Sequence, residues 1–188
     1  MSKIVIVFHS GYGDTAKIAQ AVAAGSGGTL LAIDAEGNLP SVDGTGGWEH
    51  LAAADTIVMD SPTYMGGPSW QFKKFADASS KVWFTMGWKD KQAAGFTNSA
   101  SLNGDKFSTL QYQWTLSQQH GTLWVGTGMM PANLKKSTRD DINNVGGFGG
   151  QMTATPSDAS PDEMVPGDIA TAKAFGQRVA AATARLAR

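Results

Sequence analysis

The chain has 188 residues, of which 41% are hydrophobic and 16% charged, so it can bury one substantial core, and we expect residues 1–188 to form a single domain. Cysteine is absent, which excludes disulfides, thiolate nucleophiles and cysteine-ligated metal centres, and the three histidines form no metal-binding motif. The formal net charge of -1 and the scattered lysines and arginines argue against nucleic acid or an anionic membrane as a partner.

Residues 3–8 form a short apolar run rich in β-branched side chains, which predicts a strand. The run is too short for the core of a signal peptide, and no later segment approaches the ~20 apolar residues of a membrane span, so we expect a cytoplasmic protein. A Gly-rich turn follows, after which helical spacing is seen at Thr15, Ile18, Ala19 and Val22. The apolar run 29–33 predicts a second strand, and the turn-rich residues 35–47 are expected to be exposed.

The middle of the chain continues this alternation of strands and helices. A short helix is expected over residues 48–54, a third strand over 56–59, and a helix over 69–78 that Pro68 opens. The apolar runs 92–96 and 122–125 predict the last two strands, with a helix over 107–119 between them. A final helix begins near Asp168 and carries apolar or small side chains at helical spacing.

Five short strands that alternate with helices predict an α/β fold. Right-handed crossovers place helices on both faces of such a sheet, so we expect a doubly wound, five-stranded parallel sheet. Residues 126–167 do not fit this scheme, because they are rich in Gly, Pro, Asn and Ser and lack periodicity. A segment of this length is either a disordered surface insertion or a functional element, such as a wall over the active site or an oligomer contact.

Ligands of open α/β sheets bind outside the carboxyl ends of the strands, which directs attention to the loops after the first, third and fourth strands. Each loop contains small polar side chains together with glycines, and the presence of three such loops at one edge of the sheet predicts one binding site. The candidate residues of the first loop are Ser10, Gly11, Tyr12, Gly13, Asp14 and Thr15, and those of the second are Pro62, Thr63, Tyr64, Met65 and Gly66. Those of the third are Thr97, Asn98, Ser99, Ala100, Ser101, Asn103 and Gly104.

The first loop offers hydroxyl groups and the exposed amides of a helix N-terminus, which bind phosphate without a lysine. Taken alone it also fits an ordinary capped turn, with Thr15 or Asp14 as the N-cap. In the second loop an aromatic and a thioether stand between a rigid proline and a flexible glycine pair, where a flat ring can lie. The third loop supplies amides suited to the polar edge of an isoalloxazine.

These loops resemble those of the WrbA-type NAD(P)H:quinone oxidoreductases, which are FMN enzymes of the flavodoxin-like superfamily. The family's S-x-Y-G phosphate loop matches Ser10-Gly11-Tyr12-Gly13, its P-T-[RY]-[FM]-G loop matches residues 62–66, and its Phe-Ser/Thr loop matches residues 96–104. The resemblance covers nearly the whole chain and implies FMN as cofactor, with its phosphate on the first loop and its ring between Tyr64 and the third loop. It also implies a homo-oligomer, a dimer or tetramer, with pockets near subunit interfaces.

The resemblance assigns roles to three further positions. It implies that His120 lies near the flavin ring, that Trp83 packs on the substrate side, and that Tyr12 contacts the nicotinamide dinucleotide. Without it, His120 reads as a solvated helix-end histidine and Trp83 as a core aromatic. The chain departs from its relatives at His9, at Phe148, and in a third loop that is one residue longer and poorer in glycine.

The expected function is FMN-dependent transfer of hydride from NADH or NADPH to a quinone or similar small molecule, with ping-pong kinetics. A one-electron flavodoxin carrier has the same fold and cofactor, although such carriers are typically strongly acidic. A Rossmann dehydrogenase is a second alternative, because residues 11–16 fit G-x-G-x-x-A and Asp34 follows about 20 residues later. A non-catalytic flavin-binding module is the third.

Overall fold

The computed structural model describes residues 3–186 and contains a parallel sheet with strand order β2-β1-β3-β6. The four strands are β1 (Ile4–Phe8), β2 (Thr29–Ala32), β3 (Thr56–Asp60) and β6 (Gln92–Ser99), and each pairs in parallel with its neighbour. All residues of β1 and β3 are buried, which explains their uninterrupted apolar runs, because an inner strand of a parallel sheet is covered on both faces. The expected α/β class is confirmed.

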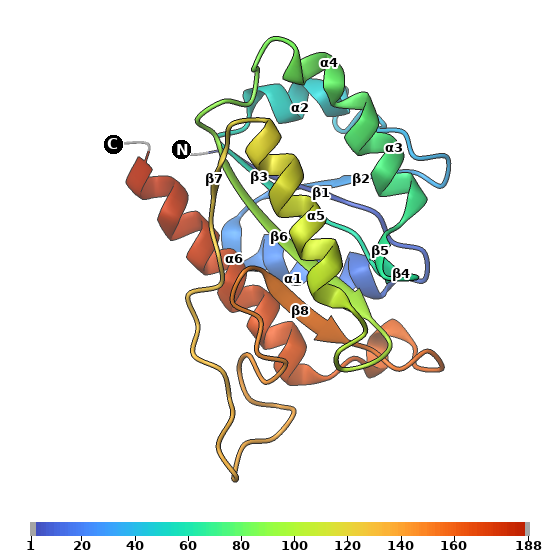
Figure 1. Cartoon of the computed structure of the whole chain (residues 1–188), viewed down its shortest axis with the longest axis vertical. Coiled ribbons are helices and arrows are strands. Elements are labelled where there is room, and N and C mark those ends of the chain that lie inside the picture. Colours follow the sequence, from blue (N-terminus) through green and yellow to red (C-terminus); the bar gives the residue numbers. More distant parts are fainter. Residues whose placement is uncertain (1–2, 187–188) are drawn as a thin grey trace.

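Two short strands share the outer edge of β6. The first two residues of β6 pair with β7 (Leu123–Trp124), and its last four pair with β8 (Gln151–Ala154). The strands β7 and β8 therefore share the fifth position of the sheet, and residues 125–150 between them lie outside the sheet (Figure 1). Residues 126–167 show no periodicity in the sequence, yet residues 151–154 of this segment form the strand β8. Four residues are too few to show an alternating pattern, so β8 is defined by its pairing with β6. The same pairing extends β6 to Ser99, past its predicted end at residue 96.

Helices cover both faces of the sheet, as Figure 1 shows. On one face, α1 (Asp14–Ser26) and α6 (Pro166–Leu186) pack on a core that includes Ile6, Val58 and Phe175. The other face carries α2 (Gly47–Ala53), α3 (Trp70–Ala78) and α5 (Lys106–Gln119) over a core that includes Val7 and Phe72. A short α4 (Ser80–Trp83) and the 3-10 helix η1 (Pro161–Glu163) were not expected from the sequence. No helix among residues 3–186 is long and apolar enough to cross a membrane.

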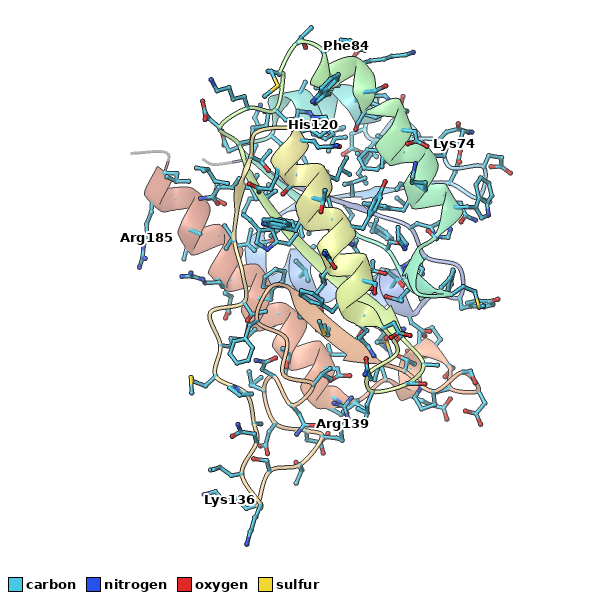
Figure 2. The ribbon with its side chains drawn as sticks, viewed as in Figure 1. Lys74, Phe84, His120, Lys136, Arg139 and Arg185 are labelled. Atoms are coloured by element: carbon cyan, nitrogen blue, oxygen red, sulfur yellow. The ribbon has the colours of Figure 1, made fainter. Side chains whose placement is uncertain are left out.

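The segment between β7 and β8 is attached to the rest of the protein at several points. Trp124 Nε1 donates to Gly149 O over 2.6 Å, and Thr127 Oγ1 donates to Gly147 O over 2.8 Å. Farther out, Arg139 forms an ion pair with the buried Asp168 of α6, with 2.7 Å between Nη2 and Oδ2. Much of this insertion therefore has defined contacts, although its tip at Lys136 projects from the body (Figure 2).

Asp60 is a buried carboxyl group at the end of β3. It is paired in register between Phe8 and Phe96, its side chain is completely buried, and neither carboxyl oxygen has a well-formed hydrogen bond to any described residue. Burial raises the pKa of Asp60 well above its ordinary value, and the Ser61 amide offsets only part of this effect. The folded state therefore favours the neutral acid.

The buried carboxyl makes stability depend on pH. Because the folded state holds the Asp60 proton that the unfolded chain has released, the free energy of unfolding falls as pH rises above about 4. We expect Asp60→Asn to flatten this dependence and to raise the free energy of unfolding at pH 7 by about 1–3 kcal/mol. Urea unfolding of both proteins between pH 4 and 8, with the exposed Asp158→Asn as control, measures the difference. Parallel pH profiles for wild type and Asp60→Asn would contradict this account.

Candidate functional site

A cavity of about 560 Å³ lies at the carboxyl edge of the sheet. The three loops singled out in the sequence meet there, because parallel strands all end at the same edge. A fourth segment, between β8 and η1, completes the wall. The lining residues are Tyr12, Asp14, Thr15, Pro62, Thr63, Tyr64, Asn98, Ser99, Ala100, Thr155, Ser157, Ala159, Ser160 and Pro161.

The first loop is shaped as a cradle at the start of α1. Ser10 Oγ accepts hydrogen bonds from the amides of Gly13 and Ala16 over 3.1 and 3.2 Å, which leaves its own hydrogen free to be donated. Gly13 has a φ of 100°, in the left-handed region, and a Cβ there would lie 2.9 Å from Pro161 Cγ. The N-cap Gly13 has no side chain, and Ser10 takes only the Ala16 amide of the first turn, so the amides of Asp14 and Thr15 keep their ability to bind a ligand.

The second loop forms a small hairpin of β4 (Thr63–Tyr64) and β5 (Gly67–Pro68). Met65 and Gly66 form its turn with φ values of 47° and 78°, and Met65 is fully exposed at the tip. The Tyr64 ring packs edge-on against Tyr12, with centroids 6.3 Å apart. The Tyr64 hydroxyl also reaches Gly11, where a Cβ would lie 2.6 Å from Oη. The two tyrosines therefore connect the first and second loops at the rim of the cavity.

Buried hydroxyl groups connect the second loop to the third. Thr63 Oγ1 lies 2.9 Å from Thr97 Oγ1 and 2.8 Å from Thr109 Oγ1, and Thr97 Oγ1 donates to Ser61 O over 2.7 Å. These groups are all buried. Because a buried network with satisfied partners has few alternative arrangements, the floor of the cavity is held rigidly.

The fourth wall of the cavity lies within residues 126–167, for which a wall over the active site was one of the alternatives, but none of its residues was singled out from the sequence. Asn98 Oδ1 accepts from Thr153 and Thr155 Oγ1 over 2.7 and 3.1 Å, which fixes the end of β8 beside β6. The chain then runs along the cavity to η1, where Lys17 pairs with Asp162 over 2.6 Å. A signal was available, because Ser160 and Glu163 form a capping box that marks a helix start. Because Asn98 Oδ1 is used in these two hydrogen bonds, a ligand can contact Asn98 only through its other atoms.

The electrostatics of the cavity come from dipoles and hydroxyls, because no lysine or arginine lines it in the described part of the chain. Burial raises the pKa of Asp14, which makes its neutral form easier to reach. Burial also raises the pKa of Tyr64, with smaller effects from Tyr12 and Asp14. An anion held here is therefore bound by the α1 amides and nearby hydroxyl groups.

Several predicted site residues belong to the converging loops without lining the cavity. Ser10, Gly11, Gly13 and Thr97 are not among the lining residues, and Met65 and Gly66 form the exposed hairpin turn. Ser101, Asn103 and Gly104 lie in the outer part of the third loop, around the side chain of Lys106.

His120 and Trp83 are not brought to this cavity within one chain. The crossover from β6 through α5 returns the chain to the amino end of β7, so the end of α5 lies at the opposite edge of the sheet (Figure 2). Both residues line a second cavity of about 430 Å³. His120 is buried rather than solvated, with Nε2 2.9 Å from Ser79 Oγ and its ring 4.2 Å from that of Trp88, and burial lowers its pKa.

Comparison with known proteins agrees with the fold and the loops. A family model described as NADPH-dependent FMN reductase matches residues 17–134. The protein named flavodoxin FldP of Pseudomonas aeruginosa is 49% identical over 180 residues, covering 96% of both chains. An NAD(P)H dehydrogenase (quinone) of Geotalea uraniireducens is 31% identical, covering 99% of this chain and 100% of its own.

Among solved structures, a flavodoxin, WrbA-like protein from Agrobacterium tumefaciens has a TM-score of 0.77 and 50% identity, covering 98% of this chain and 99% of its own. The flavodoxin-like fold is therefore confirmed, and so is the resemblance inferred from the three loops. Since the family model matches more than half of the chain and these relatives align over nearly all of it, the chain belongs to the NADPH-dependent FMN reductase family, among its flavodoxin-like, WrbA-type members.

Proposed function

We propose that the protein binds FMN in the carboxyl-edge cavity and is an oxidoreductase that transfers hydride from NADH or NADPH to a quinone. The observation that carries the proposal is the convergence of four segments, from distant parts of the sequence, on one cavity. Its volume of about 560 Å³ is within the usual range for small-molecule sites.

The first loop fits a phosphate group. Free amides at the start of α1 and the available Ser10 hydroxyl form an anion cradle, and the left-handed Gly13 lets the backbone approach closely. The buried Thr15 adds a further hydroxyl at the cavity wall.

The remaining walls fit a flat ring with polar edges. Tyr64 contributes an aromatic ring to the lining, and Ser99 and Ala100 contribute small residues of the third loop. When bound, FMN supplies the capacity to accept hydride from a nicotinamide and pass it to a quinone. The protein's residues hold the cofactor in place, and Tyr12, 82% exposed at the rim, is available to contact the dinucleotide. We expect the donor and the acceptor to bind in turn at the same face of the flavin, which predicts ping-pong kinetics.

A flavodoxin-type electron carrier is the second candidate, because the relative with 49% identity is named flavodoxin. A net charge of -1 provides little steering toward a basic partner, which favours the reductase.

The Rossmann dehydrogenase alternative required Asp34 as a ribose ligand, and the structure does not favour that role. Asp34 Oδ1 accepts from the amides of Asn38 and Glu36 over 2.7 and 3.0 Å, so this carboxylate closes its own turn.

We further propose that Trp83 reaches a flavin only through a second copy of the chain, with the buried His120 in the same cavity as Trp83. The resemblance assigns both residues to the flavin pocket, whereas one chain places them at the opposite edge of the sheet. Trp83 is 43% exposed and Phe84 beside it 80% exposed, so this edge presents an aromatic surface to another molecule. In a homo-oligomer, the loops of one copy and this edge of another would then form one active site.

The reductase and the carrier are separated by turnover. We expect FMN-loaded protein to oxidise NADH or NADPH with benzoquinone as acceptor, and double-reciprocal plots at several quinone concentrations to be parallel, as in ping-pong kinetics. Free FMN at the same concentration is the control. Protein that retains FMN but shows no turnover with either nucleotide would refute the reductase and leave the carrier.

Gly13→Val tests the phosphate cradle. A side chain at this left-handed position collides with Pro161 and blocks the close backbone approach, so we expect FMN affinity to fall by about 100-fold, or about 2.7 kcal/mol. Gly27→Val is a matched control, because Gly27 is left-handed at the other end of α1 and a Cβ there meets nothing within 4 Å. Fluorescence titration measures both. Equal FMN affinity in the two variants would place the phosphate elsewhere.

Trp83→Ala tests the contribution of a second copy. We expect kcat/KM for the quinone to fall by about 10-fold, or about 1.4 kcal/mol, with the fold retained because the side chain is partly exposed. Specific activity of the wild type is also expected to rise with protein concentration as oligomers form, followed by analytical ultracentrifugation. The exposed Leu134→Ala serves as control. Full activity in a monomeric wild-type fraction would rule out the shared site.

A further inference from the structure

Lys106 is buried where a charged side chain is costly. It is the first residue of α5 and only 1% exposed, among the largest fully buried side chains of the protein. Burial removes water from its ammonium group, and the positive end of the helix dipole adds further repulsion. A lysine in such a place requires hydrogen-bond acceptors that offset these costs.

The acceptors are consecutive carbonyl groups of the third loop. Lys106 Nζ donates to the carbonyl oxygens of Ser101, Leu102 at 3.0 Å and Asn103 at 3.3 Å. Gly104 and Asp105 follow with φ values of 51° and 52°, and two successive left-handed residues turn the chain sharply into α5. The three donors of the ammonium group thus determine the path of the loop backbone.

The charged groups around Lys106 connect it to the other walls of the cavity. Asp168 of α6 attracts the ammonium, and Arg139 of the insertion opposes it. Asp168 Oδ2 also accepts from the amide of Ala154 over 3.0 Å, at the end of β8 where the fourth wall begins. Burial is the largest influence and lowers the pKa of Lys106 to about 8.

We propose that Lys106 is a positioning residue for the flavin: by binding three carbonyls of the third loop, it sets the backbone from which Ser99 and Ala100 form a wall of the cavity. The inference rests on the proposed function, since it concerns the same site. Lys106 does not line the cavity itself and acts through the loop.

Two variants distinguish the effect of the N–H donors of Lys106 from the effect of its size. Lys106→Met keeps an apolar stem and removes all donors, whereas Lys106→Gln keeps two N–H donors without charge. We expect FMN affinity to decrease from wild type through Lys106→Gln to Lys106→Met, with a loss of about 10- to 100-fold in the last. The exposed Lys136→Met at the tip of the insertion is the matched control and should bind as wild type does. Equal affinity in all four proteins would overturn the proposal.

Hydrogen exchange of the FMN-free proteins gives a readout independent of the cofactor. We expect amides 99–105 to exchange about 10-fold faster in Lys106→Met, while the β1 and β3 amides are unchanged. If wild type binds no FMN, the proposed function fails while this comparison still tests Lys106. Unchanged exchange at 99–105 in a folded Lys106→Met protein would contradict its role.

A pH series on the wild type keeps the test valid if Lys106→Met does not fold. Opening the loop returns Lys106 to water and to its ordinary pKa, so the closed loop is stabilised as pH rises above about 8. Protection of amides 99–105, corrected for intrinsic exchange, should therefore increase between pH 7.5 and 9.5. Asp168 and Arg139 are the charged groups that act on Lys106. A flat profile would show that the ammonium is not buried against these carbonyls.

Discussion

Parallel pairing along β6 is the constraint on which the rest of the structure depends. Its first half pairs with β3 and β7, and its second half extends to pair with β8. Because all these strands run in one direction, their following loops emerge at the same edge of the sheet. Segments separated by more than a hundred residues thereby become four walls of one cavity. The same parallel connections carry the end of α5 to the other edge, which is why His120 and Trp83 lie apart from the loops.

The parts of the fold that were predictable from sequence are those with strong local signals. The buried runs of β1 and β3 and the helical spacing of α6 each reflect continuous burial of one element. The β8 strand gave no such signal, because a four-residue strand is defined by its pairing with β6 and not by a local pattern. Lys106 and Asp60 were also missed as buried groups, since the burial of a charged residue depends on tertiary neighbours that its local sequence does not reveal.

The candidate site was predictable in outline and less so in detail. Loop composition identified three of the four walls, because glycines, hydroxyl residues and a helix start occur together there. It did not reveal which side chains face the ligand. Asn98 Oδ1 braces β8, and Ser157 and Ser160, which were not predicted, add hydroxyl groups to the cavity surface. Because no lysine or arginine among residues 3–186 lines the cavity, the site depends on backbone amides held in place by buried hydroxyl networks.

Hydrogen exchange with and without FMN tests the central claim most directly, because it reports each wall separately in one experiment. Saturating FMN should slow exchange together in residues 9–15, 61–68, 97–105 and 155–161, with the concentration dependence of a single site. Saturable binding that leaves these four segments unchanged, or no saturable binding at all, would contradict the assignment of the carboxyl-edge cavity as the flavin site.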